Sequence, residues 1–308
     1  MKLDELMIKQ KNESLYFLYL HHIYIGKLIF QKNSIQIKME DEKYSFYKNS
    51  FAKLFIHEQF QKKQSLTLHY ENQIFNEENF YFMRKYKTLL FDIDDTILNF
   101  HKAERKALCL ALKKLNVEVN EEILNRYHEI NIKYWKMVEE KIITRDDCLI
   151  QRFEEFLPIY SITMKAKDFE DLYRHYLNQQ AYVIKNARLV LTNLQKNYRI
   201  YAITNGVKQT QDYRMKKAKM QSFFEKSFVS EAIGYHKPSL EYLQYVKVNI
   251  ENFQPQTTLI IGDSLSSDIQ LGINGHMDTC WFNLNRKRNT TSIQPTYEIH
   301  SLLELLYR

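Results

Sequence analysis

Acidic, hydroxyl and ammonium side chains follow apolar runs at several points of this 308-residue sequence. Reactive groups in open parallel sheets gather at the carboxyl ends of the strands. We therefore expect the residues at these points to converge on one crevice. They are Asp92 and Asp94 in FDIDDT (91–96), Thr204 in ITNG (203–206), Lys237 in HKPS (236–239), and Asp263 and Asp268 in IIGDSLSSD (260–268).

Two or three carboxylates beside a hydroxyl and an ammonium group suit phosphoryl transfer through a covalent aspartyl phosphate. One carboxylate can attack phosphorus, and a second acid can protonate the leaving oxygen and then activate water. Mg²⁺ prefers oxygen ligands and keeps several waters, so one or two carboxylates plus the phosphate are enough to hold it. A lysine and a threonine can bind the non-bridging oxygens.

The elements that would position these groups follow from the hydrophobic pattern. Continuous apolar runs are typical of strands that are buried on both faces, and helical patterns between them predict a mostly parallel α/β sheet. The expected strands are 87–93, 198–204, 225–230, 257–263 and 278–283, and the expected helices lie near 186–196, 207–221, 238–248 and 266–274.

Two further regions complete the predicted organisation. Thr204 lies 112 positions after Asp92, far more than one crossover needs, and 101–182 shows helical patterns throughout. We expect 101–182 to be a helical insertion in a core made of 85–100 and 183–308. Residues 1–84 alternate with period 2, as in SIQIKM (34–39), and predict a small β-rich module of about five strands with a short helix at 51–60.

Composition limits the expected location and partners. The charged fraction of 26% is ordinary, and the net charge of +7 is scattered; residues 1–84 hold 12 Lys and Arg against 10 Asp and Glu. We therefore expect neither nucleic acid nor a membrane as a partner. Three widely spaced cysteines without a CxxC pair suit a reducing cytoplasm, and the apolar stretch 15–30 is too short to cross a bilayer.

The four polar segments together resemble the motifs of the haloacid dehalogenase-like (HAD) superfamily of phosphohydrolases. The motifs are DxDxT at Asp92, Asp94 and Thr96, a threonine at Thr204-Asn205-Gly206, a lysine at Lys237-Pro238, and GDxxxxD at Gly262, Asp263 and Asp268. The resemblance covers about 85–308. It implies a Rossmann-like core in which 101–182 is the family's helical cap, and it leaves 1–84 as an accessory module of unknown role.

Longer segments resemble the subfamily of pyrimidine and non-standard nucleotide 5′-nucleotidases. They are YHEINIKYW (127–135), TNGVKQTQDYR (204–214), SEAIGYHKPS (230–239) and GDSLSSDIQLGINGHMDTCWFN (262–283). This likeness implies a Mg²⁺-dependent enzyme that removes the 5′-phosphate of nucleoside monophosphates, in particular those of pyrimidines.

The resemblance also implies a role for each motif residue. Asp92 would attack phosphorus, and Asp94 would act first as general acid and then as general base. Asp92, Asp263 and the main-chain carbonyl of Asp94 would bind Mg²⁺, and Asp268 would bind it through water or orient Lys237. Thr204, the main chain at Asn205, and Lys237 would hold the phosphoryl oxygens. In the cap, Asn131, Trp135 and Arg152 are candidate substrate contacts.

Two alternatives stay open at this point. A sugar phosphate or another small phosphate ester would use the same four motifs, as would the substrate of a phosphomutase. A non-catalytic module that senses a phosphate ligand would account for the unexplained residues 1–84.

Three positions depart from the subfamily pattern. Gly275-His276 stands where Ala-Gly is usual before the last core strand, and Leu271 and Lys219 replace expected glycines. We expect the glycine at the first of these sites to have moved by one position, with Gly275 in the left-handed conformation that ends many helices.

Overall fold

The computed structural model describes residues 6–12, 15–20, 23–31, 34–40, 68–70, 73–75 and 85–306. The chain divides into two compact units, which are Met1–Lys85 together with Leu305–Arg308, and Tyr86–Glu304. Each unit has its own sheet.

The N-terminal unit contains a sheet of six described strands in the order β1-β2-β3-β4-β5-β6. Neighbouring strands are antiparallel, except that β4 and β5 run parallel. The strands are β1 Leu6–Asn12, β2 Leu15–Leu20, β3 Ile23–Gln31, β4 Ser34–Met39, β5 Leu68–Tyr70 and β6 Gln73–Phe75. The predicted β module is confirmed, with six strands rather than five, while the expected helix at 51–60 lies outside the described residues.

The second unit is built on a parallel sheet with the strand order β12-β11-β10-β7-β8-β9. The strands are β7 Thr88–Asp92, β8 Arg199–Thr204, β9 Lys226–Val229, β10 Thr258–Gly262, β11 Asp278–Phe282 and β12 Tyr297–Ile299. All five predicted strands are present. Edge strand β12 was not predicted, because its three residues include a single buried side chain, Ile299, and so show no apolar run.

Helices cover this sheet and account for its apolar sequence. Leu90 of β7 packs with Tyr242 and Leu243 of α10 and with Leu271 of α11. Successive side chains of a strand point to opposite faces, so Leu89, which is also fully buried, belongs to the other face. The helical segments of this core are α7 Ala187–Leu194, α8 Lys208–Lys217, η4 Gln221–Phe223, α9 Ser230–Ile233, α10 Leu240–Val248, η5 Pro255–Thr257, η6 Leu265–Ile269, α11 Gln270–Asn274 and η7 Leu302–Leu306.

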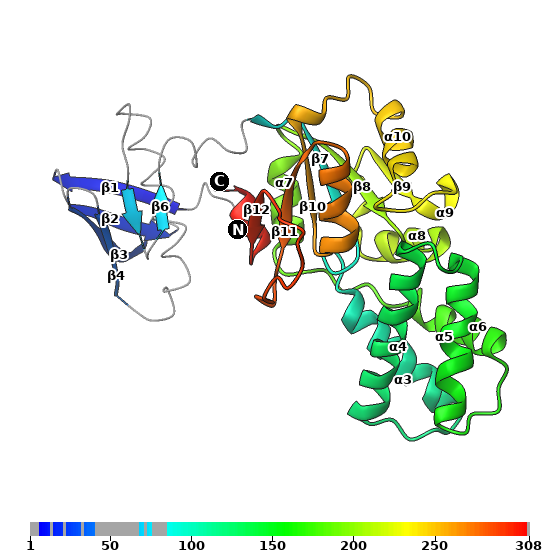
Figure 1. Ribbon diagram of the computed structural model, residues 1–308. Coiled ribbons are helices and arrows are strands. Elements are labelled where there is room, and N and C mark those ends of the chain that lie inside the picture. The colour runs from blue at the N-terminus through cyan, green and yellow to red at the C-terminus, as the bar shows by residue number, and fades with distance from the viewer. Residues whose placement is uncertain are drawn as a thin grey trace. The chain divides into compact units, whose positions relative to one another are not determined.

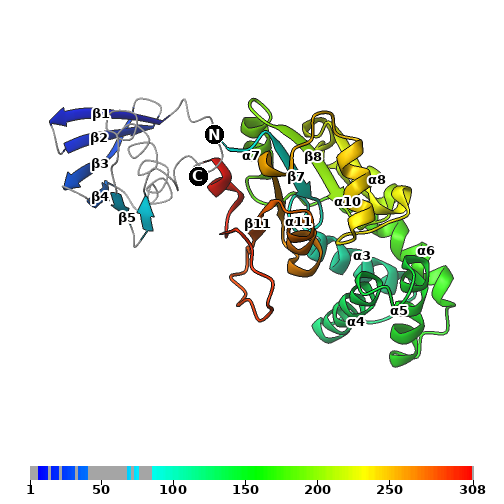
Figure 2. The same ribbon diagram turned by 45° about the horizontal axis from the view of Figure 1, so that its top comes forward.

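Four of the five helices between β7 and β8 form an insertion, and they gather as a bundle beyond one end of the parallel sheet (Figures 1 and 2). They are α3 Phe100–Lys114, α4 Glu121–Glu139, α5 Arg145–Ile159 and α6 Ala166–Leu177. Stacked and edge-on aromatic rings fill the bundle, with Tyr127 between Phe153 and Phe156. We call this bundle the cap.

Hydrogen bonds between side chains and the first backbone N–H groups define where the inserted helices begin. The Asn99 side chain accepts a hydrogen bond from the backbone of Lys102 at the start of α3, and Asn120 does the same for α4. Thr144 and Asp147 form a reciprocal capping box at the start of α5. Such caps satisfy backbone N–H groups that have no partner within the helix. In the described part of the chain, no helix combines the length and the apolar character needed to cross a membrane.

The two helix ends with unusual residues use the left-handed conformation without glycine. His276 has φ 56° and Lys219 has φ 53°, whereas Gly275 has φ −93°. The expectation that Gly275 supplies the left-handed residue is therefore wrong, because the turn places His276 at that position. Lys219 closes α8, and bonds from Lys219 N to Lys216 O and from Met220 N to Met215 O complete the turn.

Replacing Lys219 with glycine is expected to stabilise the folded protein, because a left-handed residue with a Cβ costs about 1 kcal/mol or more. Lys219 is exposed, so no buried contact is lost. The matched control is Lys216→Gly at an exposed site in the last turn of the same helix, where glycine is expected to destabilise by up to about 1 kcal/mol. Thermal unfolding should therefore give midpoint shifts of opposite sign, and two shifts of the same sign would contradict this account.

Candidate active site

The carboxyl ends of three adjacent strands bring the predicted site residues together. Strand β7 lies between β10 and β8 in the sheet. It ends at Asp92, while β8 ends at Thr204 and β10 at Gly262, one residue before Asp263. Because parallel strands share one carboxyl edge, side chains separated by more than 150 positions become neighbours.

Lys237 joins two carboxylates at this edge. Its Nζ lies 2.7 Å from Asp92 Oδ1 and 2.6 Å from Asp268 Oδ1, and it also donates to the carbonyl oxygen of Ile203 at 3.2 Å. The Lys237 and Asp268 side chains are almost completely buried. The second oxygen of Asp268 accepts a bond from Ser264 N at 3.1 Å. With both its oxygens engaged in this way, Asp268 can orient Lys237.

The loop that carries Lys237 is fixed by the side chain of Asn205. Asn205 Oδ1 accepts from Lys237 N at 2.8 Å, and Asn205 Nδ2 donates to Lys237 O at 2.9 Å. The side chain of Asn205 thus clamps the lysine's own peptide groups, a contact that its predicted main-chain role did not include. The Thr204 hydroxyl oxygen accepts from Gly206 N and from Gln211 Nε2, each at 3.0 Å. The hydroxyl proton of Thr204 is therefore available for a hydrogen bond to another acceptor.

The residues at this edge fit a divalent cation with a preference for oxygen. Carboxylate oxygens of Asp92, Asp263 and Asp268 all lie within 4.8 Å of one another. Asp92 Oδ2 is buried and has no hydrogen-bond partner in the described structure. A hard cation such as Mg²⁺ suits such a donor set, and the free oxygen of Asp92 is the atom that would meet either the cation or a phosphorus atom.

Burial and mutual repulsion disturb the titration of these acids. Burial raises the pKa of Asp92 to about 8, against the attraction of Lys237 and with a further increase from Asp268. Burial, followed by the charges of Asp92 and Asp268, also raises the pKa of Asp263 well above its ordinary value. Burial alone would lower the pKa of Lys237, but the charges of Asp268 and Asp92 raise it. Added positive charge would therefore favour the ionised acids.

Two further residues hold Asp94 at the edge of the site. Arg214 Nη1 lies 2.5 Å from Asp94 Oδ1, and Gln211 Nε2 lies 2.5 Å from Asp94 Oδ2. Arg214 is fully buried and also donates from Nε to the carbonyl oxygen of Gln180. Sequence reasoning assigned no role to either residue, although both lie in the nucleotidase-like segment 204–214. Their spacing of three on helix α8 places them on one helical face.

Asp95 lies between the site and the cap and accepts a hydrogen bond from the N-terminus of α3. It has φ 57° and accepts a bond at 3.1 Å from His101 N in the first turn of α3. Burial raises its pKa to about 6. A second contact between bundle and core joins Ser266 Oγ to Glu139 Oε2 at 2.8 Å. The cap is therefore joined to the core by contacts at Asp95 and at Ser266.

A cavity of about 240 Å³ connects the carboxylate edge with the cap. From the core it is lined by Asp92, Asp94, Thr204, Asn205, Lys237, Asp263 and Asp268. From the cap it is lined by Trp135 and Arg152, two of the predicted substrate contacts, and by Glu170, Tyr173 and Arg174. The third predicted contact, Asn131, does not line this cavity. It lies behind Arg152, which donates from Nη1 to Asn131 Oδ1 at 2.7 Å.

The chain belongs to the haloacid dehalogenase-like hydrolases, because the model of that family matches residues 89–282. It is 40% identical over 225 residues to YfnB of Bacillus subtilis, a protein named as a HAD-hydrolase, covering 73% of this chain and 96% of YfnB. A solved structure of YfnB bound to magnesium covers 72% of this chain and 97% of its own, with a TM-score of 0.69 and 41% identity. The family match begins after the last described strand of the N-terminal sheet.

Two other relatives carry more specific names. The pyrimidine 5′-nucleotidase PynA of Streptococcus pneumoniae is 34% identical over 222 residues, covering 72% of this chain and 94% of PynA. The pyrimidine 5′-nucleotidase YjjG of Escherichia coli is 25% identical over 221 residues, covering 72% of this chain and 96% of YjjG. The family, its fold and its hydrolase class are those predicted from the sequence motifs.

Magnesium is expected to stabilise the protein more at about pH 8 than at about pH 5.5. Acids with a raised pKa bind more protons when folded than when unfolded, so the free energy of unfolding falls as the pH rises from their ordinary pKa towards the folded one. For Asp92 this folded pKa is about 8. A bound cation offsets this loss by favouring the ionised acids. Thermal midpoints with and without Mg²⁺ at both pH values measure the effect.

Two variants test where the magnesium acts. Asp263→Asn should remove most of the Mg²⁺-induced shift. The control Asp168→Asn, at an exposed site on α6, should keep all of it. Equal shifts at the two pH values, or an unchanged shift in Asp263→Asn, would contradict the assignment of the cation to the carboxylate edge.

Proposed function

We propose that the protein is a cytoplasmic, Mg²⁺-dependent phosphatase that removes the 5′-phosphate of pyrimidine nucleoside monophosphates. The observation that carries the proposal is the cavity that runs from Asp92, whose Oδ2 has no hydrogen-bond partner in the described structure, to a polar and aromatic wall of the cap. One end matches a phosphate and the other a nucleoside. The proposal is supported by the similarity to two proteins named as pyrimidine 5′-nucleotidases.

In the first half of the proposed reaction, Asp92 Oδ2 forms a bond to phosphorus while the bond between phosphorus and O5′ breaks. Lys237 holds the other oxygen of Asp92 at 2.7 Å, which leaves Oδ2 directed at the substrate. Asp94, in its protonated form, passes its proton to the departing O5′. The Thr204 hydroxyl donates to a non-bridging oxygen.

In the second half, a water molecule gives a proton to Asp94 and its oxygen bonds to phosphorus, as the bond to Asp92 breaks and phosphate leaves. Arg214 and Gln211 keep Asp94 at the edge of the cavity throughout. When Mg²⁺ is bound, Asp92, Asp263 and the main-chain carbonyl of Asp94 would hold it, and its charge would lessen the repulsion between the nucleophile and the phosphate.

The cap wall offers polar atoms for a nucleobase. Arg174 Nε is buried with no hydrogen-bond partner in the described structure, while its Nη2 lies 3.0 Å from Glu170 Oε1. The other oxygen of this carboxylate is bound by Arg152, whose Nη2 lies 2.6 Å from Glu170 Oε2. Uracil and cytosine both carry hydrogen-bonding edges and a flat face. The guanidinium and carboxylate groups can pair with such edges, and Trp135 can stack on the face.

A panel of nucleoside monophosphates and sugar phosphates tests the reaction and its substrate together. Phosphate release should be highest with pyrimidine monophosphates and should require Mg²⁺. Asp92→Asn should lower turnover by at least about 10³-fold, because it removes the nucleophilic oxygen but keeps the side chain's shape. Asp168→Asn, an exposed change elsewhere, should retain turnover. Release from sugar phosphates alone would overturn the nucleotidase proposal, and no release from any ester in a folded chain would overturn the catalytic role itself.

Replacing Trp135 tests the nucleoside end of the cavity. Trp135→Ala is expected to raise KM for a pyrimidine monophosphate by about 3- to 10-fold, because aromatic stacking contributes about 0.5–1.5 kcal/mol. Trp135→Phe should restore most of the loss. With a small phosphate ester that has no ring, both variants should match the parent protein. An equal rise in KM for both kinds of ester would show that Trp135 does not recognise the base.

A further inference from the structure

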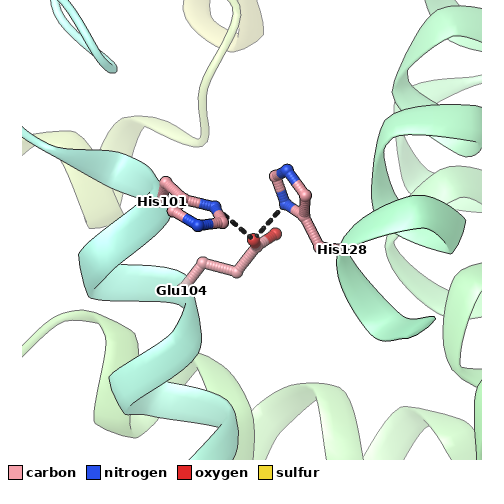
Figure 3. A group of neighbouring side chains, drawn as sticks. All are labelled: His101, Glu104 and His128. Carbon is pink, nitrogen blue, oxygen red and sulfur yellow. Dashed lines mark hydrogen bonds and ion pairs between the residues drawn. The ribbon is translucent and has the colours of Figure 1, made fainter. Parts of the chain in front are cut away.

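A second group of metal-ligating side chains lies inside the cap, apart from the carboxylate edge. His101 and Glu104 are three residues apart on α3, and His128 faces them from α4 (Figure 3). One ligand atom of each lies within 4.8 Å of the other two. We call these three residues the cap His–Glu site.

The three side chains converge on a single oxygen. His128 Nδ1 lies 2.6 Å from Glu104 Oε2, and His101 Nδ1 lies 3.9 Å from the same atom. In a tetrahedral site with bonds of about 2.0–2.1 Å, neighbouring ligand atoms are about 3.3 Å apart. The two distances lie on either side of that value. Small rotations of the histidines, which are 33% and 48% exposed, would therefore bring all three atoms to bonding distance.

The carboxylate of the site is already oriented by a neighbouring amide. Glu104 is buried, and its other oxygen, Oε1, accepts a bond at 2.7 Å from Nδ2 of Asn131. Asn131 is fixed in turn by Arg152. Metal-binding carboxylates and histidines are commonly held by such outer hydrogen bonds, which set the direction of the ligand and strengthen binding.

The surroundings leave room for further ligands. The two histidines and Asn131 line a second cavity of about 640 Å³, next to the cavity of the carboxylate edge. A metal ion held by three protein side chains needs a water or a small ligand in its fourth position, and this cavity gives access to it. Asp95 and Lys287 also line the cavity, so their opposite charges partly offset each other at the site.

We propose that the cap His–Glu site binds one divalent transition-metal ion of the zinc class. Two imidazoles and one carboxylate suit Zn²⁺, Co²⁺ or Ni²⁺, whereas Mg²⁺ is bound through oxygen atoms. The chain would thus separate two kinds of metal by chemistry, with a hard ion at the carboxylate edge and a softer ion in the cap. The site differs from that of the proposed reaction and shares no residue with it.

Cobalt binding to the full chain tests this site. Co²⁺ would be added in the presence of excess Mg²⁺, which occupies the carboxylate edge, and binding followed by visible absorption and calorimetry. The parent protein should bind one Co²⁺ that Zn²⁺ displaces. His101→Ala and Glu104→Gln should each weaken this binding by at least about 10-fold. The glutamine can keep the bond from Asn131, so the second variant guards against a loss caused by misfolding.

Two control variants test whether side chains outside the cap His–Glu site bind the cobalt. His175→Ala changes an exposed histidine on α6 of the same bundle and should leave the cobalt spectrum and stoichiometry unchanged. Asp263→Asn disrupts the carboxylate edge and should also leave both unchanged. The proposal is overturned if His101→Ala binds cobalt as tightly as the parent, or if excess Mg²⁺ prevents binding. Because no activity is measured, the result is independent of the proposed reaction.

Discussion

The buried ammonium group of Lys237 is the interaction around which the carboxylate edge is arranged. It lies between Asp92 and Asp268 in a place that water barely reaches. Two of the three acids at this edge, Asp92 and Asp268, are buried, and their charges are unfavourable there unless positive charge balances them. Lys237 supplies one positive charge, while three carboxylates have oxygens within 4.8 Å of one another. The edge can therefore accept a cation, and its carboxylate oxygens suit one that prefers oxygen ligands.

A chain of charged and amide groups extends this arrangement through the cap. Glu104 contacts Asn131, Asn131 contacts Arg152, and Arg152 contacts Glu170, with donor–acceptor distances of 2.6–2.7 Å. At one end is the cap His–Glu site and at the other is the wall of the cavity that holds Asp92. Buried polar groups are costly unless each finds a partner. This requirement explains why the polar side chains inside an otherwise aromatic bundle bond to one another in a continuous row.

The core and the cap contribute different parts of the site because they are built differently. In the core, the site residues lie at or after the ends of strands, and the hydrogen-bonded sheet fixes the positions of their backbones. Such positioning is what reacting groups require. The cap is a separate bundle with its own aromatic interior, joined to the core by the chain near Asp95 and by the contact of Ser266 with Glu139. A bundle of this kind can change its inner wall without altering the reacting groups.

The amino-acid sequence by itself determined the family, the parallel sheet and the motif residues. Apolar runs that end in Asp92, Thr204 and Asp263 carry that information locally, since each run is buried on both faces and each polar residue follows directly. The inserted helices were also readable from their periodicity. Such patterns depend on neighbours in the chain and need no knowledge of distant contacts.

Only the tertiary structure decided which residues meet across the fold. It brought Arg214 and Gln211 to Asp94, and it paired the side chain of Asn205 with the backbone of Lys237. It also placed Asn131 against Arg152, outside the cavity that holds Asp92. The histidines at 101 and 128 likewise come from different helices, and their approach to Glu104 depends on how α3 packs against α4. Such pairings have no local signal, because they are set by the packing of elements that are far apart in the chain.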